Sequence, residues 1–186
     1  MVHTDRLQTE YEIEVRWLAF PLHPEVPEEG LSLEELFAGR GVNISDSLQH
    51  LKRVASSLSL PLTDRTRTYN SRLAQELAKW AESQGKEDEF HHTIFRAYFV
   101  DGKNIGRIDE LVTLAASIGL PANEARDVIL ARRFREAVDS DWVQSHALGV
   151  TAVPTFIVGD QRIVGFQSYQ VLEQFVIDSG ARAKQG

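Results

Sequence analysis

The sequence predicts an α/β fold in which a long block of helices interrupts a small sheet-containing core. Three observations carry this prediction. Hydrophobicity alternates with a period of two near the N-terminus, follows a helical period from about residue 31 to 147, and returns to a strand pattern after Pro154. We therefore expect a core made of residues 1–30 and 148–186, with residues 31–147 as an inserted helical domain.

Residues 10–17 are predicted to form the first strand, because apolar and charged side chains alternate there. Such a strand has one face against the core and one in water, as expected near a sheet edge. Pro21 and Pro24 lack a backbone donor and end the strand. Residues 1–9 are expected to be the end of a helix or a disordered start. The inward positions are Tyr11, Ile13, Val15 and Trp17, and the outward ones are Glu10, Glu12, Glu14 and Arg16.

The block 31–147 carries apolar side chains at the spacing of successive amphipathic helices, with no convincing strand between them. Ser45 and Asn70 are expected N-caps, since their side chains can accept hydrogen bonds from the first free backbone amides. A cluster of arginines is interpreted as a solvated helix face: Arg132, Arg133 and Arg135. Three aromatic residues at helical spacing are interpreted as part of the hydrophobic core: Trp80, Tyr98 and Phe99. The alternative that they line a groove between the insertion and the core stays open.

Beyond Pro154 the sequence predicts a β-hairpin and a last helix. Thr155–Val158 and Arg162–Val164 have strand patterns on either side of a turn, and residues 169–178 have an amphipathic helical pattern. Gly180 ends that helix, and residues 181–186 are expected to be a loose tail.

Composition argues against several classes of function. The net charge of −7 and the isoelectric point near 5.4 disfavour a nucleic-acid partner or an anionic membrane surface, because both require a basic protein surface. No apolar stretch approaches the length of a membrane span and no signal peptide is found, so a cytoplasmic location is expected. The sequence contains no cysteine, which excludes disulfides, thiolate zinc sites and iron–sulfur clusters.

Motifs for common enzyme chemistries are also missing. The nucleophile elbow, the P-loop and the dinucleotide-binding glycine pattern do not occur, so hydrolase, phosphoryl-transfer and dinucleotide functions have no support. His91 and His92 are adjacent and point about 100° apart on a helix, whereas helical metal ligands need a spacing of four residues. We therefore expect no metal site, no cofactor and no catalytic residue.

A resemblance to a known family rests on motifs spread over residues 11–177. The most specific motif is Gly149-Val150-Thr151-Ala152-Val153-Pro154-Thr155-Phe156. The others are Asn70-Ser71 with Ala74, Phe95-Arg96-Ala97-Tyr98-Phe99, Ile105-Gly106 and Val164-Gly165-Phe166-Gln167. With these motifs the chain resembles the DsbA-like thioredoxin family, in its FrnE-type branch. That branch is similar in fold to the 2-hydroxychromene-2-carboxylate isomerases and the kappa-class glutathione transferases.

The resemblance implies a thioredoxin-like fold with a helical insertion and a cis peptide bond between Val153 and Pro154. Members of the family begin with a central strand and a Cys-Pro-x-Cys-type motif. Neither is found here, so the expected core lacks its N-terminal strand and the redox dithiol. The implied binding site is the loop of Val153, Pro154 and Thr155, whose backbone would pair with an extended peptide or a glutathione-like thiol. Binding would survive, but dithiol exchange would not, because it needs one thiolate to attack and another to leave.

Two other functions remain open from the sequence. One is a glutathione-dependent isomerase or transferase of the 2-hydroxychromene-2-carboxylate or kappa-class type, which can act without a dithiol. The other is a truncated active oxidoreductase whose missing segment lies upstream of Met1. Loss of the first strand also predicts one of two rearrangements. Either residues 11–20 pair directly with Thr155–Val158, or a second copy covers the exposed edge; a homodimer is favoured.

Overall fold

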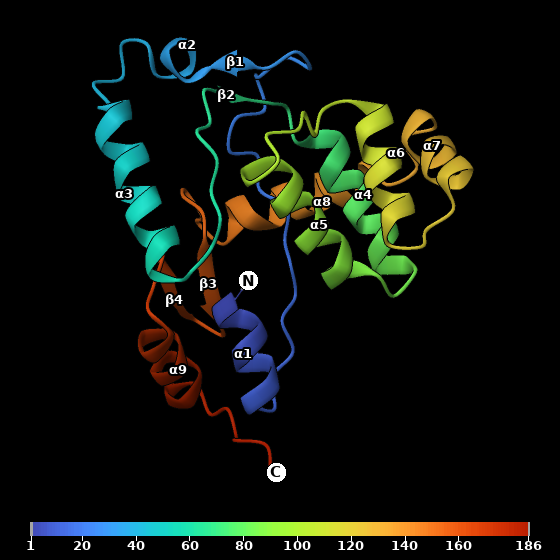
Figure 1. Cartoon of the computed structure of the whole chain (residues 1–186). Helices are drawn as coiled ribbons and strands as arrows, with labels where there is room; N and C mark the ends of the chain where they lie inside the picture. Colours follow the sequence, from blue (N-terminus) through green and yellow to red (C-terminus); the bar gives the residue numbers. More distant parts are fainter. Residues whose placement is uncertain (1, 186) are drawn as a thin grey trace. The chain divides into compact units, whose positions relative to one another are not determined.

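A computed structural model describes residues 2–185 of the chain. The chain divides into two compact units, one made of Met1–Leu22 with Ser140–Gly186 and the other of His23–Asp139 (Figure 1). Each unit has an apolar core of its own. The sequence placed the corresponding boundaries near residues 30 and 148.

The first unit consists of helices packed on a β-hairpin. Its elements are α1 (Val2–Glu10), the C-terminal part of α8 (Arg135–Ala147), β3 (Thr155–Val158), β4 (Gln161–Val164) and α9 (Tyr169–Asp178). The core is Leu7, Tyr169, Leu172, Phe175 and Val176, with Tyr11, Ile13, Phe156, Ile163 and Ala181 packed against it. These elements confirm the predicted hairpin and last helix.

The hairpin has a two-residue turn between Val158 and Gln161, which lie opposite each other in the antiparallel register. Gly159 has a φ of 56° in this turn, a conformation that is favourable only for residues such as glycine. Within residues 2–185, β3 pairs with β4 alone. Direct pairing of residues 11–20 with this strand, one of the two rearrangements expected, is therefore wrong.

The predicted strand at residues 10–17 is also wrong. α1 extends through Glu10, and residues 13–20 belong to no helix and no ladder. The one bridge recorded for this segment in the described chain joins Tyr11 to Ala183. The periodicity did report burial correctly, since the odd positions are half-buried and the even ones exposed: Tyr11, Ile13 and Val15 against Glu12, Glu14 and Arg16. The segment thus has a strand's alternation of burial without a strand's hydrogen-bonded neighbours.

The tail after residue 180 is attached to α1, which contradicts the expectation of a loose end for residues 181–185. Lys184 donates from its backbone to the Glu10 carbonyl at 2.8 Å and from Nζ to the Gln8 carbonyl at 2.6 Å. Glu12 donates its backbone N–H to the Arg182 carbonyl at 2.8 Å. The tail thus satisfies carbonyls at the C-terminal end of α1, which have no partner inside the helix. Residue 186 of the expected tail lies outside the described residues.

The second unit is mainly helical, as predicted, but it contains a short sheet that the sequence did not predict. β1 (Leu31–Ser32) and β2 (Arg67–Thr68) pair antiparallel. The helices are α2 (Leu33–Phe37), α3 (Ile44–Ser57), α4 (Arg72–Ser83), α5 (Glu87–Phe99), α6 (Ile108–Ser117) and α7 (Ala122–Leu130), followed by the start of α8. Its core includes Leu77, Trp80, Phe90, Leu111 and Ile129.

The two expected helix caps have different outcomes. Ser45 lies inside α3, and the cap is Asn43, whose side chain accepts from the backbone N–H of Asp46. Asn70 does accept from the backbone N–H of Arg72 at 2.8 Å, although Ser71 is the residue directly before α4. The Asn70 side chain also donates to a carbonyl of the loop before β1, and this second contact fixes the start of α4 to that loop.

Candidate functional site

The loop that leads into β3 is the candidate ligand-binding site. The three predicted site residues lie together there: Val153 is 46% exposed, Pro154 is exposed and Thr155 is half-buried. The Val153–Pro154 peptide bond is cis. The sequence therefore located a surface loop whose apolar side chain faces solvent at the entry to the hairpin.

Contacts from within the first unit hold this loop in place. Arg162 on β4 donates from Nη1 to the carbonyls of Leu148 and Gly149, at 3.1 and 3.2 Å. Gly149 has a φ of 68°, and a Cβ there would lie 2.9 Å from the same Arg162 nitrogen. The Thr155 hydroxyl donates to the Ala152 carbonyl at 2.6 Å. Arg162 and Thr155 thus preorganise the loop, which lowers the entropy lost when a ligand binds.

One row of backbone groups in this site has no partner. Pro154 accepts from the backbone N–H of Gly165 at 2.7 Å, so its carbonyl is directed at β4. Because alternate residues of a strand direct their backbone groups to opposite edges, Thr155 and Ile157 direct theirs away from β4. Among residues 2–185, the backbones of Val153, Thr155 and Ile157 have no hydrogen bond to another segment. The loop and β3 therefore present an open edge.

The same hairpin has an uncovered apolar face. Phe156 and Ile163 are directed at the core, so the residues that alternate with them lie on the opposite face. Val164 lies on that face and is 49% exposed, and two further large apolar side chains next to the hairpin in sequence, Val153 and Phe166, are 46% and 49% exposed. The site thus offers backbone pairing groups beside exposed apolar surface, which suits the binding of an extended chain.

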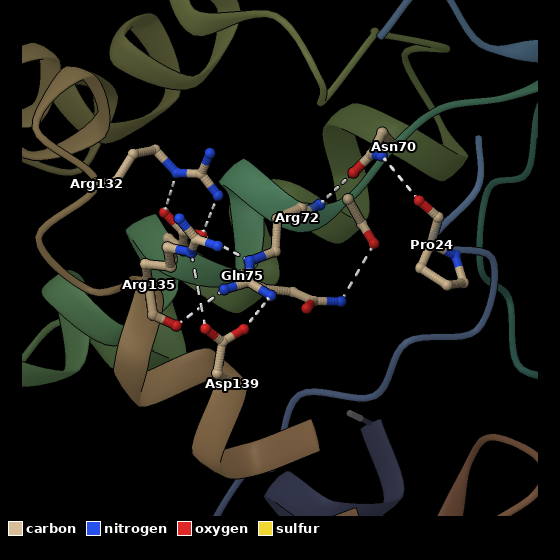
Figure 2. A network of polar contacts seen from close by, with 9 residues as sticks. Pro24, Asn70, Arg72, Gln75, Arg132, Arg135 and Asp139 are labelled. Atoms are coloured by element: carbon tan, nitrogen blue, oxygen red, sulfur yellow. Dashed lines mark hydrogen bonds and ion pairs between the residues drawn. The ribbon is translucent and has the colours of Figure 1, made fainter. Parts of the chain in front are cut away.

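A second polar assembly, in the other unit, joins α4 to the start of α8 (Figure 2). At its centre is Glu76, which is only 1% exposed. Arg132 donates from Nε and Nη2 to the two oxygens of Glu76, at 2.7 and 2.6 Å, and Arg72 donates from Nε at 2.6 Å. Arg72 also forms an ion pair of 2.7 Å with Asp139. Arg132, Arg133 and Arg135 are all exposed, as expected, but the sequence did not predict that Arg132 also binds the buried Glu76.

The charge of Glu76 is maintained by its two arginine partners. Burial by itself disfavours the ionised carboxylate, but the hydrogen bonds and charges of Arg132 and Arg72 outweigh it, so the pKa of Glu76 is lowered. Both carboxylate oxygens are engaged by these arginines. This assembly therefore binds one helix to another, and we assign it no ligand or reaction.

The remaining sequence candidates do not form a reactive group. Trp80 is 2% exposed and belongs to the core of the second unit, as predicted, while Tyr98 and Phe99 are half-buried at the end of α5. His91 is largely buried, and burial lowers its pKa from 6.5 to about 4. Within residues 2–185, no group of three or more His, Asp or Glu side chains could hold a metal ion. No helix in the same range is long and apolar enough to cross a membrane.

The fold of the chain recurs in solved structures. A probable DsbA oxidoreductase, SCO1869 from Streptomyces coelicolor, superposes with a TM-score of 0.81 at 23% identity, over 90% of this chain and 76% of that one. A 2-hydroxychromene-2-carboxylate isomerase superposes with a TM-score of 0.71 at 18% identity, over 95% of this chain and 85% of that one. The chain is thus an α/β protein with a thioredoxin-like fold and a helical insertion.

Sequence comparison gives the family. The profile of the DSBA-like thioredoxin domain matches residues 3–176. The chain belongs to this family. It is also 28% identical over 179 residues to the protein YwbO of Bacillus subtilis (strain 168), a match that covers 90% of this chain and 82% of YwbO.

Proposed function

We propose that this DsbA-like chain binds an extended peptide or a small thiol such as glutathione at the loop of Val153, Pro154 and Thr155, without dithiol–disulfide exchange. The observation that carries the proposal is the open backbone edge of Val153, Thr155 and Ile157 beside the exposed Val153 side chain. The sequence contains no cysteine, so these 186 residues supply no thiolate for exchange. We place the chain in the FrnE-type branch on its Gly149–Phe156 motif, and we propose a cytoplasmic location.

Titration of the ¹⁵N-labelled protein with glutathione, and separately with an extended peptide, tests the binding site. We expect amide shifts at Val153 and Thr155. A Val153→Asp variant should bind an apolar peptide about tenfold more weakly, because a carboxylate would lose water on binding without gaining a partner. Val171→Asp on α9 is the matched control, since Val171 is 43% exposed and lies outside the loop. Shifts confined to other parts of the chain would reject the loop as the site.

The alternative of an active oxidoreductase predicts a different result. If these residues carried that activity, the protein would accelerate the reduction of insulin by dithiothreitol. We expect the uncatalysed rate. Acceleration that persists after contaminating thioredoxins have been removed would contradict the proposed absence of dithiol–disulfide exchange. The transferase alternative predicts instead that glutathione is consumed in the presence of an electrophilic substrate, and the isomerase alternative predicts a rearranged substrate with glutathione required but not consumed.

A further inference from the structure

Arg65, in the connection between α3 and β2, is a half-buried arginine without an acidic partner. Within residues 2–185 its side chain has no hydrogen bond and no ion pair, and its Nε atom is enclosed by protein. The neighbouring Asp64 is bound by Lys52 instead. By contrast, the largely buried Arg72 binds the carboxylate of Glu76. Because a charge removed from water is costly without a counter-charge, Arg65 is a cation with unused binding capacity.

Two aromatic rings fix the guanidinium of Arg65. Its central carbon lies 4.9 Å from the centroid of the Tyr98 ring and 5.5 Å from that of Phe99, within the range of cation–π attraction. Tyr98 is itself held by a hydrogen bond of 2.9 Å between its hydroxyl and that of Thr68. The backbone N–H of Thr63 donates to the Phe99 carbonyl at 3.0 Å and so attaches this connection to the end of α5. The cation is therefore preorganised, which lowers the entropy lost when an anion binds.

An exposed aromatic surface adjoins this cation through Phe99. Phe95 and Phe99 lie four residues apart on one face of α5, and their rings are stacked with centroids 5.7 Å apart and planes at 13°. Phe95 has 43% of its surface in water. Rigid aromatic side chains beside an arginine are typical of the residues that contribute most to protein–protein binding. We call the four residues Arg65, Phe95, Tyr98 and Phe99 the Arg65 surface.

The charge of the surrounding segment favours an acidic partner. Residues 40–68 contain five arginines and lysines and two aspartates, a net charge of +3 in a chain whose net charge is −7. A positive segment in an acidic chain attracts and orients a partner that presents carboxylates. A carboxylate also matches the planar guanidinium, which can donate two parallel hydrogen bonds to it.

We propose that the Arg65 surface binds a segment of a partner protein in which an acidic residue lies next to an aromatic or large apolar one. The carboxylate pairs with Arg65, and the apolar side chain covers Phe95 and Phe99. The inference goes beyond the proposed function, because this surface lies wholly within the second unit and uses no residue of the loop at Val153. A nucleic acid fits less well, since the net charge of −7 opposes the approach of its phosphates.

NMR of the Arg65 side chain in the unaltered protein tests the proposal. The probe is a capped peptide of alternating aspartate and phenylalanine that begins and ends with aspartate. On addition to the ¹⁵N-labelled protein, we expect shifts of the Arg65 Nε–Hε signal and of the backbone amides of Phe95 and Phe99. An Arg65 signal that does not move with the probe at millimolar concentration would overturn the proposal. A short oligothymidylate that causes the same shifts at lower concentration would overturn the protein partner in favour of a nucleic acid.

A thermodynamic cycle identifies the ion pair. A neutral probe with asparagine at each aspartate position should bind the unaltered protein at least about fivefold more weakly. Arg65→Gln should bind the two probes within about twofold of each other, since the carboxylate has lost its partner. Arg53→Gln, an equal change of charge at an exposed position on α3, is the matched control and should keep the difference between the probes. An equal loss of discrimination in both variants would indicate general charge attraction and overturn the assignment to Arg65.

Phe95→Ala tests the apolar contact. The variant should weaken the acidic probe by about fivefold or more, because it removes the exposed ring against which the probe packs. Leu130→Ala on α7 is the matched control, since Leu130 is 62% exposed and lies outside the Arg65 surface. An unchanged affinity of Phe95→Ala for the acidic probe would overturn the aromatic contact.

Val153→Asp separates this inference from the proposed function. The proposed function predicts that this variant binds an apolar peptide weakly at the loop, whereas the Arg65 signal should still shift with the acidic probe. If the Arg65 shift disappears in Val153→Asp, the Arg65 surface is not a site of its own and the inference is wrong. If no ligand shifts the amides of Val153 and Thr155 while the Arg65 shift persists, the proposed function is wrong and the Arg65 surface stands.

Discussion

Arg132 forms a fork on Glu76, donating from Nε and Nη2 to the two carboxylate oxygens at 2.7 and 2.6 Å across a separation of 56 residues. The two ends of this pair differ in exposure, since the side chain of Glu76 is 2% exposed and that of Arg132 is 42% exposed. Both contacts are charge-assisted hydrogen bonds, so their strength depends on the ionised state of the Glu76 carboxylate.

Glu76→Gln should lower the free energy of unfolding at pH 7 by about 2–3 kcal/mol, because it removes the negative charge between two arginines and leaves the shape nearly unchanged. Because water can solvate the partly exposed guanidinium of Arg132 after the substitution, the loss of unfolding free energy should stay below that for a fully buried ion pair. The pKa of Glu76 is lowered in the folded chain, so its contribution is complete above about pH 4.3 and is lost as the pH falls through the folded pKa. Urea denaturation at pH 7 and pH 3.5 measures the difference, which should shrink at the lower pH.

Asp139→Asn is the matched control for this substitution. Asp139 also binds an arginine, at 2.7 Å from Arg72, but its side chain is 50% exposed. Ion pairs in water contribute little, so the loss should stay below about 1 kcal/mol. If the two variants lose the same stability, burial does not determine the strength of the Glu76 contacts.

The neutral state of His91 predicts a second pH effect at higher pH. Burial lowers the pKa of His91 from 6.5 to about 4, so the unfolded chain takes up a proton below pH 6.5 that the folded chain does not. Stability should therefore be complete above pH 6.5 and decrease towards pH 4, by at most about 3 kcal/mol. His91→Asn, which is neutral at every pH, should flatten this part of the stability curve. An unchanged slope between pH 6.5 and pH 4 in this variant would contradict the assignment to His91.

Gly30 and Gly39 allow the cost of steric overlap to be separated from the cost of backbone strain. Both have positive φ, at 78° and 73°, but a Cβ on Gly30 would lie 2.3 Å from the Thr68 carbonyl oxygen, whereas a Cβ on Gly39 would meet nothing within 4 Å. Gly39→Ala should cost about 1–2 kcal/mol for the left-handed backbone alone. Gly30→Ala should cost about 2–5 kcal/mol, because overpacking is added. Thermal unfolding measures both, and equal losses would show that Thr68 moves away without cost.

Local periodicity predicted most of the fold. The helical block, the hairpin and α9 can each be predicted from a window of a few residues, from the spacing of apolar residues and from turn residues such as Gly159. The segment at residues 10–17 shows the limit of that information. Alternation reports that one side of a segment is buried, but a strand also needs a neighbouring backbone, and the sequence of the segment does not say whether one is there.

The candidate site was predictable only in part. Val153, Pro154 and Thr155 were found from a motif, since the motif is contiguous in the sequence. The open row at Thr155 and Ile157 could not be found in that way, because it depends on the hairpin register. The fork of Arg132 on Glu76 was missed for a related reason: both residues have the composition of a solvated helix face, and only tertiary packing brings them together.

The homodimer expected from the sequence stays a prediction, and the structure suggests where to test it. Val164 on the hairpin, and Val153 and Phe166 next to it in sequence, are large apolar side chains with nearly half of their surface in water, and exposed apolar surface favours association because its burial removes that surface from water. We expect light scattering at micromolar concentration to give twice the mass of one chain. Val164→Lys should shift the equilibrium towards monomer, because a dimer through this surface would bury two lysine charges. Val171→Lys on α9, where the exposure is similar at 43%, should leave the dimer intact. A monomer at all concentrations would reject the dimer and leave this surface free for the ligand.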